Sequence, residues 1–396
     1  ESSAASDVYK RQPFIYLDSA STSQKPQKVI DTISSYYNSY TANVHRALYS
    51  IGEKATDEYE NVRLLVKKML NVPDSHSVIF TSGTTESINL IAYSWGLKNL
   101  KKADSVLITE MEHHSNIIPW QLITKKTNSS LNYIPLCNNG TLNTESMNEQ
   151  LLSSTKIISI SHQSNVFGTI NPIKNIIDKA KSMDILTLID GAQAVPHLEV
   201  DLAELDSDFY VFSGHKMLGP TGVGVLIGRN ELLEEMEPFL GGGEMINKVN
   251  MHESTWNEIP WKFEAGTPKV AQVIGLGAAI KYLMNIGLEN IHNHEQGLLQ
   301  YALDILEQNE NIILYGNPPE RGAVIPFNLK NIHAHDLAKF LDLDGICIRA
   351  GHHCAQPIMD YLNVSSTARI SMNIYNDEND IDILAAGIKK TISTLN

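Results

Sequence analysis

The chain has 396 residues, of which 42% are hydrophobic and 19% charged, a composition typical of a globular protein with a large buried core. Its formal net charge of -14 argues against nucleic acid or an anionic membrane as a main partner, because both would require a basic face. No apolar run has transmembrane length and no secretory signal pattern opens the chain, so we expect a cytoplasmic protein with three reduced cysteines.

The first part of the chain is predicted to contain a tail, a strand and a helix. Residues 1–12 are small and polar without periodicity, and we interpret them as a disordered or non-native tail. The strand-like FIYLD follows, and then the turn-rich stretch SASTSQKP. Apolar residues at three- and four-residue spacings predict an amphipathic helix over residues 54–70.

Seven apolar segments between residues 78 and 228 predict the strands of one sheet. Most are near-continuous apolar runs rather than alternations, which favours strands buried on both faces. Helical patterns separate several of them, so we predict an α/β fold with a mostly parallel sheet covered by helices. We assign residues 13–285 to this large domain.

The pattern changes after Thr267. A helical region from about 270 to 308 is broken near Gly287, and short strand and helix patterns then alternate to a final helix. The expected strands include IILYG, AVIPFNL, GICIRAG and ARISMNIYN. We interpret residues 286–396 as a smaller α+β domain.

Lys216 is the first candidate for chemistry. The apolar run at 209–212 ends in the Ser213-Gly214 turn signal, which places His215 and Lys216 at a strand's carboxyl end, where open α/β sheets hold their active sites. A lysine shielded there loses its proton more easily and becomes an amine nucleophile, which suggests a Schiff base. A solvated surface lysine is the alternative.

Two further strand ends carry polar groups suited to a heterocyclic phosphate. Thr84 and Thr85 lie in TSGTTE, between a strand and a helix, and together with the helix N-terminus they indicate an anion site. Asp190 ends the strand ILTLID and Gln193 follows, and such a carboxylate can keep a ring nitrogen protonated. Ordinary helix N-caps remain the alternative for both segments.

The remaining candidates are a histidine, polar side chains and a thiol. His113, beyond the strand SVLIT, can stack on an aromatic ligand and exchange protons, and a metal site shared with His114 is the alternative. Candidates for a substrate carboxylate are Arg349, Arg369 and Asn165. Cys354 in GHHCAQP has a loop context, so we expect it to be the reactive thiol, and we expect no metal.

Together these segments resemble a cysteine desulfurase of the SufS type, a pyridoxal-phosphate enzyme of the aminotransferase class V group with the type I fold. The resemblance runs from about Pro13 to the C-terminus. It rests on nine motifs in order: YLDSAST, NVHRA, FTSGTTESIN, EMEHHSNIIPW, SNVFGT, DGAQAVPH, FSGHKMLGPTGVGVL, FEAGTP and RAGHHCAQP.

The resemblance implies a role for each site residue. For the cofactor it implies that Lys216 holds it covalently, Asp190 pairs with its ring nitrogen and Gln193 contacts its ring hydroxyl, while His113 stacks on the ring. The residues implied to bind its phosphate are Thr84, Thr85, Ser213 and His215. Thr267 would reach the phosphate from the neighbouring subunit of a homodimer. For the substrate it implies that Asn165 and Arg369 bind the carboxylate while His45, Arg46 and Arg349 line the entrance.

The implied reaction converts L-cysteine to L-alanine. Lys216 would move the α-proton, with His113 as a further proton carrier, and Cys354 would take the sulfur as a persulfide. The sulfur would pass to an acceptor protein of the SufE or SufU type for iron-sulfur cluster assembly, and L-selenocysteine would be a second substrate. His352, His353 and Arg349 are the candidates for activating the thiol.

The chain departs from the family's pattern in two loops. Ala47 stands where the family has glycine, and KVAQ follows FEAGTP in place of a small, glycine-containing run. Two other readings stay open: another class V enzyme, such as an aminotransferase or a kynureninase-like lyase, and a catalytically silent subunit that binds phosphate or zinc.

Overall fold

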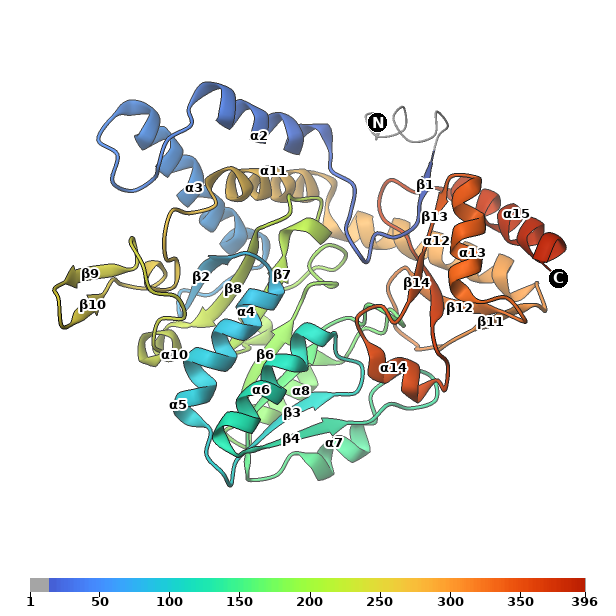
Figure 1. Ribbon diagram of the computed structural model, residues 1–396, viewed down its shortest axis with the longest axis horizontal. Coiled ribbons are helices and arrows are strands. Elements are labelled where there is room, and N and C mark those ends of the chain that lie inside the picture. Colours follow the sequence, from blue (N-terminus) through green and yellow to red (C-terminus); the bar gives the residue numbers. More distant parts are fainter. Residues whose placement is uncertain (1–13, 396) are drawn as a thin grey trace.

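The structure is a computed structural model that describes residues 14–395 (Figure 1). The tail predicted over residues 1–12 lies outside the described residues. A seven-stranded sheet forms the centre of the larger lobe. Its strands are, in spatial order, β2 (His76–Thr81), β8 (Gly224–Arg229), β7 (Phe209–Ser213), β6 (Leu186–Asp190), β5 (Thr155–Ser161), β3 (Ser105–Thr109) and β4 (Ser130–Ile134).

The strand directions confirm the prediction of a mostly parallel sheet. Neighbouring strands from β7 to β4 are parallel, whereas β8 runs antiparallel to both β7 and β2. The carboxyl ends of β5, β6 and β7 therefore meet at one edge of the sheet, and side chains that follow them lie close together.

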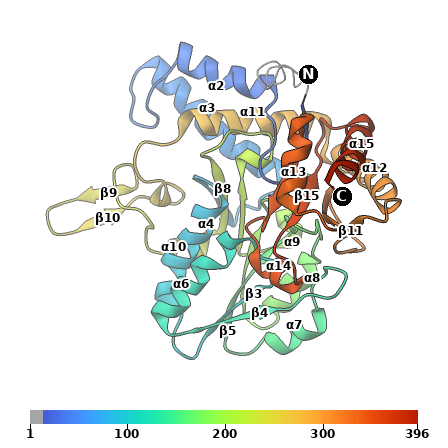
Figure 2. The same cartoon turned by 45° about the vertical axis from the view of Figure 1, so that its right-hand side comes forward.

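Helices cover both faces of this sheet (Figures 1 and 2). One face packs against α3 (Ser50–Met69), α8 (Ile173–Lys181) and α11 (Val270–Ile286), and the other against α4 (Thr84–Ile91), α6 (Ile118–Thr127) and α10 (Asn230–Glu235). In β7, Tyr210 and Phe212 enter the first core, and Phe209 and Val211 enter the second. Successive side chains of a strand point to opposite faces, so burial on both sides requires the continuous apolar runs seen in the sequence.

The other elements of the larger lobe lie around this sandwich. They are α2 (Gln27–Ser39), a π-helical turn (Ala92–Gly96), α5 (Leu97–Asn99), α7 (Thr144–Gln150), α9 (Leu202–Leu205) and the hairpin of β9 (Ile246–Val249) and β10 (Ser254–Trp256). The hairpin projects from the body of the molecule and was not predicted from the polar sequence around it (Figure 1).

The smaller lobe contains a four-stranded antiparallel sheet in the order β11 (Ile312–Leu314), β12 (Val324–Leu329), β15 (Thr367–Ser371) and β14 (Arg349–Gly351). Its core also draws on the helices α12 (Leu288–Glu307), α13 (Ala334–Leu343) and α15 (Glu378–Leu395). Helix α11 ends at Gly287, whose φ of +88° suits glycine, and α12 begins directly after it.

One predicted strand of this lobe is wrong in detail. The run GICIRAG forms two strands in different sheets, because the chain changes partner at Ile348. Strand β13 (Ile346–Cys347) pairs in parallel with β1 (Ile15–Tyr16), whereas β14 pairs with β15. Leu17 accordingly belongs to the core of the smaller lobe, and the chain's first described strand lies beside its last quarter.

No single helix within residues 14–395 is long and apolar enough to cross a membrane. Helices α11 and α12 satisfy the length and composition only as a pair, and that pair is bent by 76°.

Replacing Gly224 with alanine is expected to destabilise the protein. A Cβ at this position would lie 2.3 Å from the Cα of Gly83, in the turn that leads into α4, so the backbone would have to move. We expect the free energy of unfolding to fall by about 1–3 kcal/mol, measured by denaturant titration. Gly297→Ala in α12 is the matched control, because nothing lies within 4 Å of its added Cβ, and it is expected to be neutral or stabilising. Equal stability of the two variants would contradict the expected crowding at Gly224.

Candidate active site

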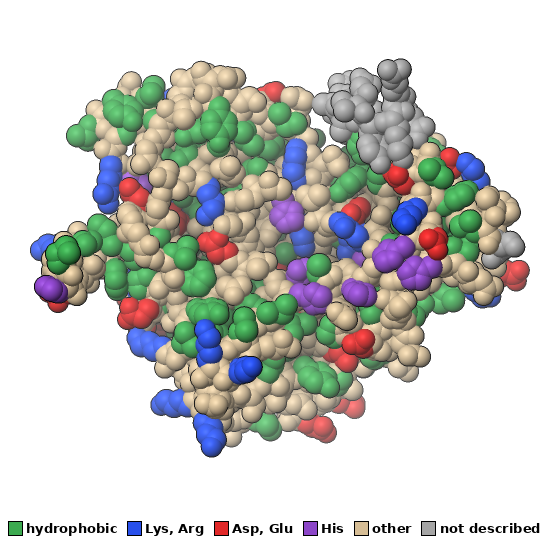
Figure 3. All heavy atoms as spheres, in the orientation of Figure 1, with side chains coloured by type: hydrophobic (Ala, Val, Ile, Leu, Met, Phe, Trp, Pro, Cys, Tyr) green, Lys and Arg blue, Asp and Glu red, His purple; other side chains and the backbone are tan. Residues whose placement is uncertain are grey.

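A cavity of about 480 Å³ lies at the carboxyl edge of the large sheet, between the two lobes. Histidine side chains gather near the middle of the face shown in Figure 3, and the cavity lining includes several of them. The predicted site residues that line it are Thr84, Thr85, His113, Asn165, Asp190, Gln193, Ser213, His215, Lys216, Arg349, Cys354 and Arg369. Strand ends, helix starts and loops from both lobes therefore supply one site.

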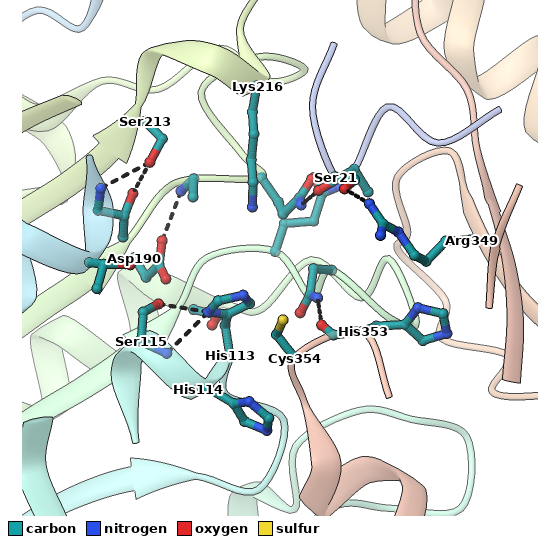
Figure 4. A pocket seen from close by; sticks show the side chains of 18 of the residues that line it. Ser21, His113, His114, Ser115, Asp190, Ser213, Lys216, Arg349, His353 and Cys354 are labelled. Atoms are coloured by element: carbon teal, nitrogen blue, oxygen red, sulfur yellow. Dashed lines mark hydrogen bonds between the residues drawn. The ribbon is translucent and has the colours of Figure 1, made fainter. Parts of the chain in front are cut away.

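Lys216 follows β7 in a short 3₁₀ turn, Gly214–Lys216, and its side chain enters the cavity (Figure 4). Burial lowers the pKa of Lys216 to about 8, an effect that the carboxylate of Asp190 opposes and the guanidinium of Arg369 reinforces. No hydrogen bond or ion pair to its amine occurs within residues 14–395. The amine therefore loses its proton more readily than an ordinary lysine and stands free to react with a carbonyl group.

The start of α4 forms the end of the cavity suited to an anion. The N-cap residue of this helix is Gly83, which has no side chain to cap it and has a φ of +155°. The Ser213 hydroxyl accepts a hydrogen bond of 2.9 Å from the Thr84 amide and lies 2.8 Å from the Thr84 hydroxyl. These groups tie β7 to α4 and surround the helix N-terminus with donors, which is the arrangement that binds phosphate groups.

Asp190 and Gln193 lie together beyond β6, and each has an oxygen available to a ligand. One carboxylate oxygen of Asp190 accepts a hydrogen bond of 2.9 Å from the Ala192 amide, and burial raises the pKa of this carboxyl. The Gln193 amide donates to the Ala20 carbonyl at 2.7 Å, whereas its own oxygen is buried without a partner among the described residues. A buried polar atom without a partner is costly, so a ligand donor is expected there.

His113 is held as a neutral ring with its proton on Nε2. Burial, assisted by the charge of Lys216, lowers the pKa of His113 to about 3. Its Nδ1 accepts a hydrogen bond of 3.1 Å from the Ser115 amide and lies 2.7 Å from the Ser115 hydroxyl. An acceptor Nδ1 in a neutral imidazole places the ring proton on Nε2, so that atom is the one able to donate in the cavity.

Two arginines reach the cavity from the smaller lobe and share Asp18. Arg369 is buried, with Nη2 at 2.9 Å from Asp18 Oδ1 and Nη1 donating to the Asn165 carbonyl at 2.9 Å. Its Nε is buried and has no partner within residues 14–395. Arg349 is exposed and lies 2.9 Å from the other oxygen of Asp18, with a further contact to Ser21. A single carboxylate thus orients both cations toward the position of an anionic substrate group.

Cys354 lies in a strained loop that contacts both lobes. His353 and Cys354 have φ values of +54° and +55°, in the left-handed region that residues other than glycine rarely adopt. The loop is held because the Asn165 amide donates to the His353 carbonyl at 2.7 Å and the His114 amide donates to the Cys354 carbonyl at 2.7 Å. Of the three cysteines, Cys354 is the exposed one. Figure 4 shows Cys354 and Lys216 entering the cavity from opposite sides.

The histidine beside the thiol is uncharged. Burial, assisted by Arg369, lowers the pKa of His353 to about 2, and its Nε2 lies 2.8 Å from the Thr367 hydroxyl. His353 therefore supplies no positive charge to a thiolate at neutral pH. The charges that interact with Cys354 across the cavity are instead those of Lys216 and Arg369.

Three predicted site residues lie outside this cavity. His45 is 2.9 Å from Glu60, Arg46 is 3.4 Å from Glu244, and Thr267 is exposed in the loop before α11. The Ala47 backbone does not adopt a positive φ, so alanine is accommodated there without that strain. Within residues 14–395, no three His, Cys, Asp or Glu side chains form a group able to hold a metal ion.

Asp18 was missed in the sequence, although its position carried a usable signal. It follows the strand residues of YLD, as Asp190 ends ILTLID. What the sequence did not indicate is that the strand belongs beside β13, which brings Asp18 to the two arginines. Asn165 as the anchor of the Cys354 loop also became apparent only through a contact distant in sequence, whereas Ser115, which orients His113, lies two residues from it.

The chain belongs to the aminotransferase class V family, whose model matches residues 15–384. Pyridoxal 5'-phosphate is the cofactor of this family, so the cofactor prediction is confirmed. Within the family, the chain is similar to the cysteine desulfurases, as its motifs predicted. It is 51% identical over 379 residues to a probable cysteine desulfurase of Halalkalibacterium halodurans, covering 96% of this chain and 93% of that one. A probable cysteine desulfurase of Staphylococcus aureus is 50% identical over 377 residues, covering 95% and 91% of the two chains.

Solved structures show the same fold. The cysteine desulfurase CsdA of Escherichia coli, in an S-sulfonic acid form, superposes with a TM-score of 0.91 at 35% identity, covering 97% of this chain and 96% of that one. The cysteine desulfurase of Thermococcus onnurineus superposes with a TM-score of 0.92 at 34% identity, covering 96% and 95%. The type I fold predicted from the sequence is confirmed.

The residues present fit this cofactor on their own chemistry. Among the described residues, the amine of Lys216 is buried without a hydrogen-bond partner and the oxygen of Gln193 has no partner. The start of α4 offers donors to a phosphate. Asp190 supplies a carboxylate that interacts with Lys216 across the cavity, and such a carboxylate can keep a ring nitrogen protonated.

Labelling of the cofactor-free protein is expected to show the lowered pKa of Lys216. Only the free amine reacts with acetic anhydride, so its reactivity rises with pH below the pKa and levels off above it. With a pKa of about 8, the Lys216 acetylation rate measured by peptide mass spectrometry should level off by about pH 9. A rate that still rises tenfold between pH 9 and 10 would contradict the effect of burial.

Proposed function

We propose that this chain is a cysteine desulfurase that converts L-cysteine to L-alanine and retains the sulfur as a persulfide on Cys354. The observation that carries the proposal is the placement of an exposed thiol and a buried, unpaired amine in one cavity with two arginines. An ordinary transaminase site needs the amine and an arginine but has no use for a thiol on a strained loop.

Substrate binding is assigned to Arg369, Arg349 and Asn165. Arg369 already has Asp18 and the Asn165 carbonyl as partners, and its unpartnered Nε leaves a donor for one carboxylate oxygen of the substrate. Arg349 is exposed and lines the cavity, where its cation can meet an incoming amino acid. His113 and His353 are neutral, so they add no positive charge to the cavity that would attract anions other than the substrate carboxylate.

Proton movement is assigned to Lys216 and His113. When bound, pyridoxal phosphate supplies an electron sink for the bonds at the substrate's α-carbon. Lys216, with its pKa near 8, is able to remove a proton there and to return one, since a base works best near the operating pH. His113 offers Nε2–H as a second proton donor on the other side of the cavity.

The sulfur step is assigned to Cys354. Its thiolate forms an S–S bond with the substrate sulfur while the Cβ–S bond of the substrate breaks. The electron pair of that bond stays with the carbon skeleton, which takes up a proton and leaves as alanine. The exposed position of Cys354 lets an acceptor protein reach the product.

We extend the proposal to a SufS-type role. The acceptor would be a SufE- or SufU-type protein supplying iron-sulfur cluster assembly in the cytoplasm, and L-selenocysteine would be a second substrate. The support is the exposed thiol loop and the nine motifs of the sequence. Mass spectrometry of a candidate acceptor after incubation with cysteine-treated enzyme tests the transfer.

A homodimer is part of the same proposal. Thr267, His45 and Arg46 are distant from this chain's cavity but lie on surface loops, where a second copy can present them to its partner's site. Two exposed apolar side chains, Leu48 close to Arg46 in the sequence and Met251 in the β9–β10 hairpin, support an interface between copies. Sedimentation equilibrium measures the oligomeric state, and a monomer with full activity would refute this part.

Cys354→Ala is expected to abolish alanine formation from L-cysteine while cofactor binding persists. Without the thiol, no nucleophile of this chain takes the sulfur, so the rate should fall by about 100-fold or more. Alanine and sulfide are measured with dithiothreitol present. Cys137→Ala is the control, because Cys137 lies outside the cavity, and it should remain within about twofold of wild type. Wild-type rates in Cys354→Ala would exclude the persulfide step, and an oxo acid product would indicate a transaminase.

Arg369→Lys is expected to raise the KM for L-cysteine by about 10- to 100-fold, because an ammonium cannot reproduce the planar contacts of a guanidinium. Cofactor affinity should change little, since Arg369 is assigned to the substrate. Arg229→Lys, in an ion pair with Asp206 and Asp208, is the control. An unchanged KM in Arg369→Lys would remove this residue from the substrate site.

A further inference from the structure

The loop between β1 and α2, residues 18–26, has polar contacts that the proposed reaction does not require. The sequence marked it as turn-rich and marked its first residues as part of the YLDSAST motif. The Ala20 amide donates to Ser371 in the smaller lobe at 2.9 Å, and the Ala20 carbonyl accepts from Gln193 at 2.7 Å. The loop thus lies against both the smaller lobe and the cofactor-binding residues.

Its last residues converge on one carbonyl group, that of His215. This oxygen belongs to the peptide that joins His215 to Lys216. Its donors are Lys25 Nζ at 2.8 Å and, each at 3.1 Å, the Ser23 amide, the Ser23 hydroxyl and the Thr22 hydroxyl. A carbonyl oxygen has two lone pairs, so four nearby donors supply more than it can accept at full strength.

Lys25 is the charged member of this group. Its ammonium also contacts the Ser23 carbonyl at 2.5 Å, and no carboxylate forms an ion pair with it within residues 14–395. Burial without a counter-charge lowers the pKa of Lys25 to about 8. A lysine needed only for solubility would extend into water, whereas this one directs its charge at backbone oxygens.

The same contacts continue into the turn beyond Lys216. The Ser23 hydroxyl accepts a hydrogen bond of 2.9 Å from the Leu218 amide, and Leu218 has a φ of +63°. The loop that Lys25 closes therefore holds the His215–Lys216 peptide and also the Met217–Leu218 peptide of the following turn. Since no hydrogen bond to the Lys216 amine occurs among the described residues, the direction of the side chain is set by its backbone and by packing.

We propose that Lys25 is a positioning residue that fixes the peptide between His215 and Lys216, and thereby aims the Lys216 amine into the cavity. The charged donor strengthens the hold on the His215 carbonyl beyond that of the neutral donors around it. The inference rests on the assignment of Lys216 as the cofactor lysine. It adds a residue that lies behind the site and touches neither cofactor nor substrate.

The experiment compares Lys25→Met, Lys25→Arg and Ser23→Ala with the wild type. Methionine keeps the length of the side chain without the donor, and arginine restores a cationic donor. A neighbouring cavity of about 300 Å³ lined by Lys25 gives arginine room. The control is Lys28→Met, since Lys28 is an exposed lysine one turn further along, in α2. Each protein is stripped of cofactor and titrated with pyridoxal phosphate, and the affinity is followed by the visible absorbance. We also measure the kcat and KM for cysteine and the Tm of the cofactor-free form.

We expect Lys25→Met to bind the cofactor about tenfold more weakly, with a reduced kcat and little change in KM, while Lys25→Arg recovers most of the loss. Ser23→Ala should show a smaller defect in the same direction. Lys28→Met should match the wild type.

Two results would overturn the proposal. One is a cofactor affinity and absorbance of Lys25→Met within twofold of wild type. The other is a loss of cofactor affinity in Lys25→Met that is accompanied by a matching fall in the Tm of the cofactor-free protein and is not recovered in Lys25→Arg. This result would make Lys25 an ordinary structural contact. If Lys25→Met does not fold, Lys25→Gln, which removes the charge, is judged against Lys25→Arg by the same two criteria. A wild type that binds cofactor but forms no alanine would refute the proposed function and leave the affinity comparison intact.

Discussion

Burial of the Lys216 amine without a hydrogen-bond partner in the described part of the chain is the constraint on which the rest of the site depends. An ammonium group in this position is disfavoured, and the nearby guanidinium of Arg369 disfavours it further. The amine can serve the reaction only because the carboxylate of Asp190 limits the fall in its pKa and the surrounding backbone holds the side chain in place. A surface lysine in the same sequence would be protonated, mobile and unreactive.

The polar groups around this amine divide into two sets by the elements that hold them. The strand ends and the start of α4, all in the larger lobe, provide the carboxylate, the amide and the anion-binding donors. The smaller lobe provides Arg349, Arg369 and Cys354. The cavity exists where these two sets meet, so relative displacement of the lobes would separate the thiol from the amine.

Asp18 links the two sets. It follows a strand paired with the smaller lobe, precedes the loop that holds the His215 carbonyl, and orients both arginines. The first described segment of the chain is therefore a bridge between the lobes rather than a peripheral strand. This placement explains why a short stretch of small and polar residues makes so many contacts, with Gln193, Ser371 and Tyr375 among its partners.

The sequence alone determined the α/β class, the strands of the large sheet, the break between α11 and α12, and the family. Continuous apolar runs show that both faces of a strand are buried, and glycines mark the turns, so both signals can be read from neighbouring residues. It also indicated Lys216, Asp190 and Cys354, which stand at strand ends or in a distinctive loop. It did not determine the split of residues 345–351 between two sheets, the contact of Asp18 with both arginines, or the convergence of Lys25 on the His215 carbonyl. Those features join segments some 190 to 350 residues apart, and no local pattern encodes such pairing because only the packed chain brings the partners together.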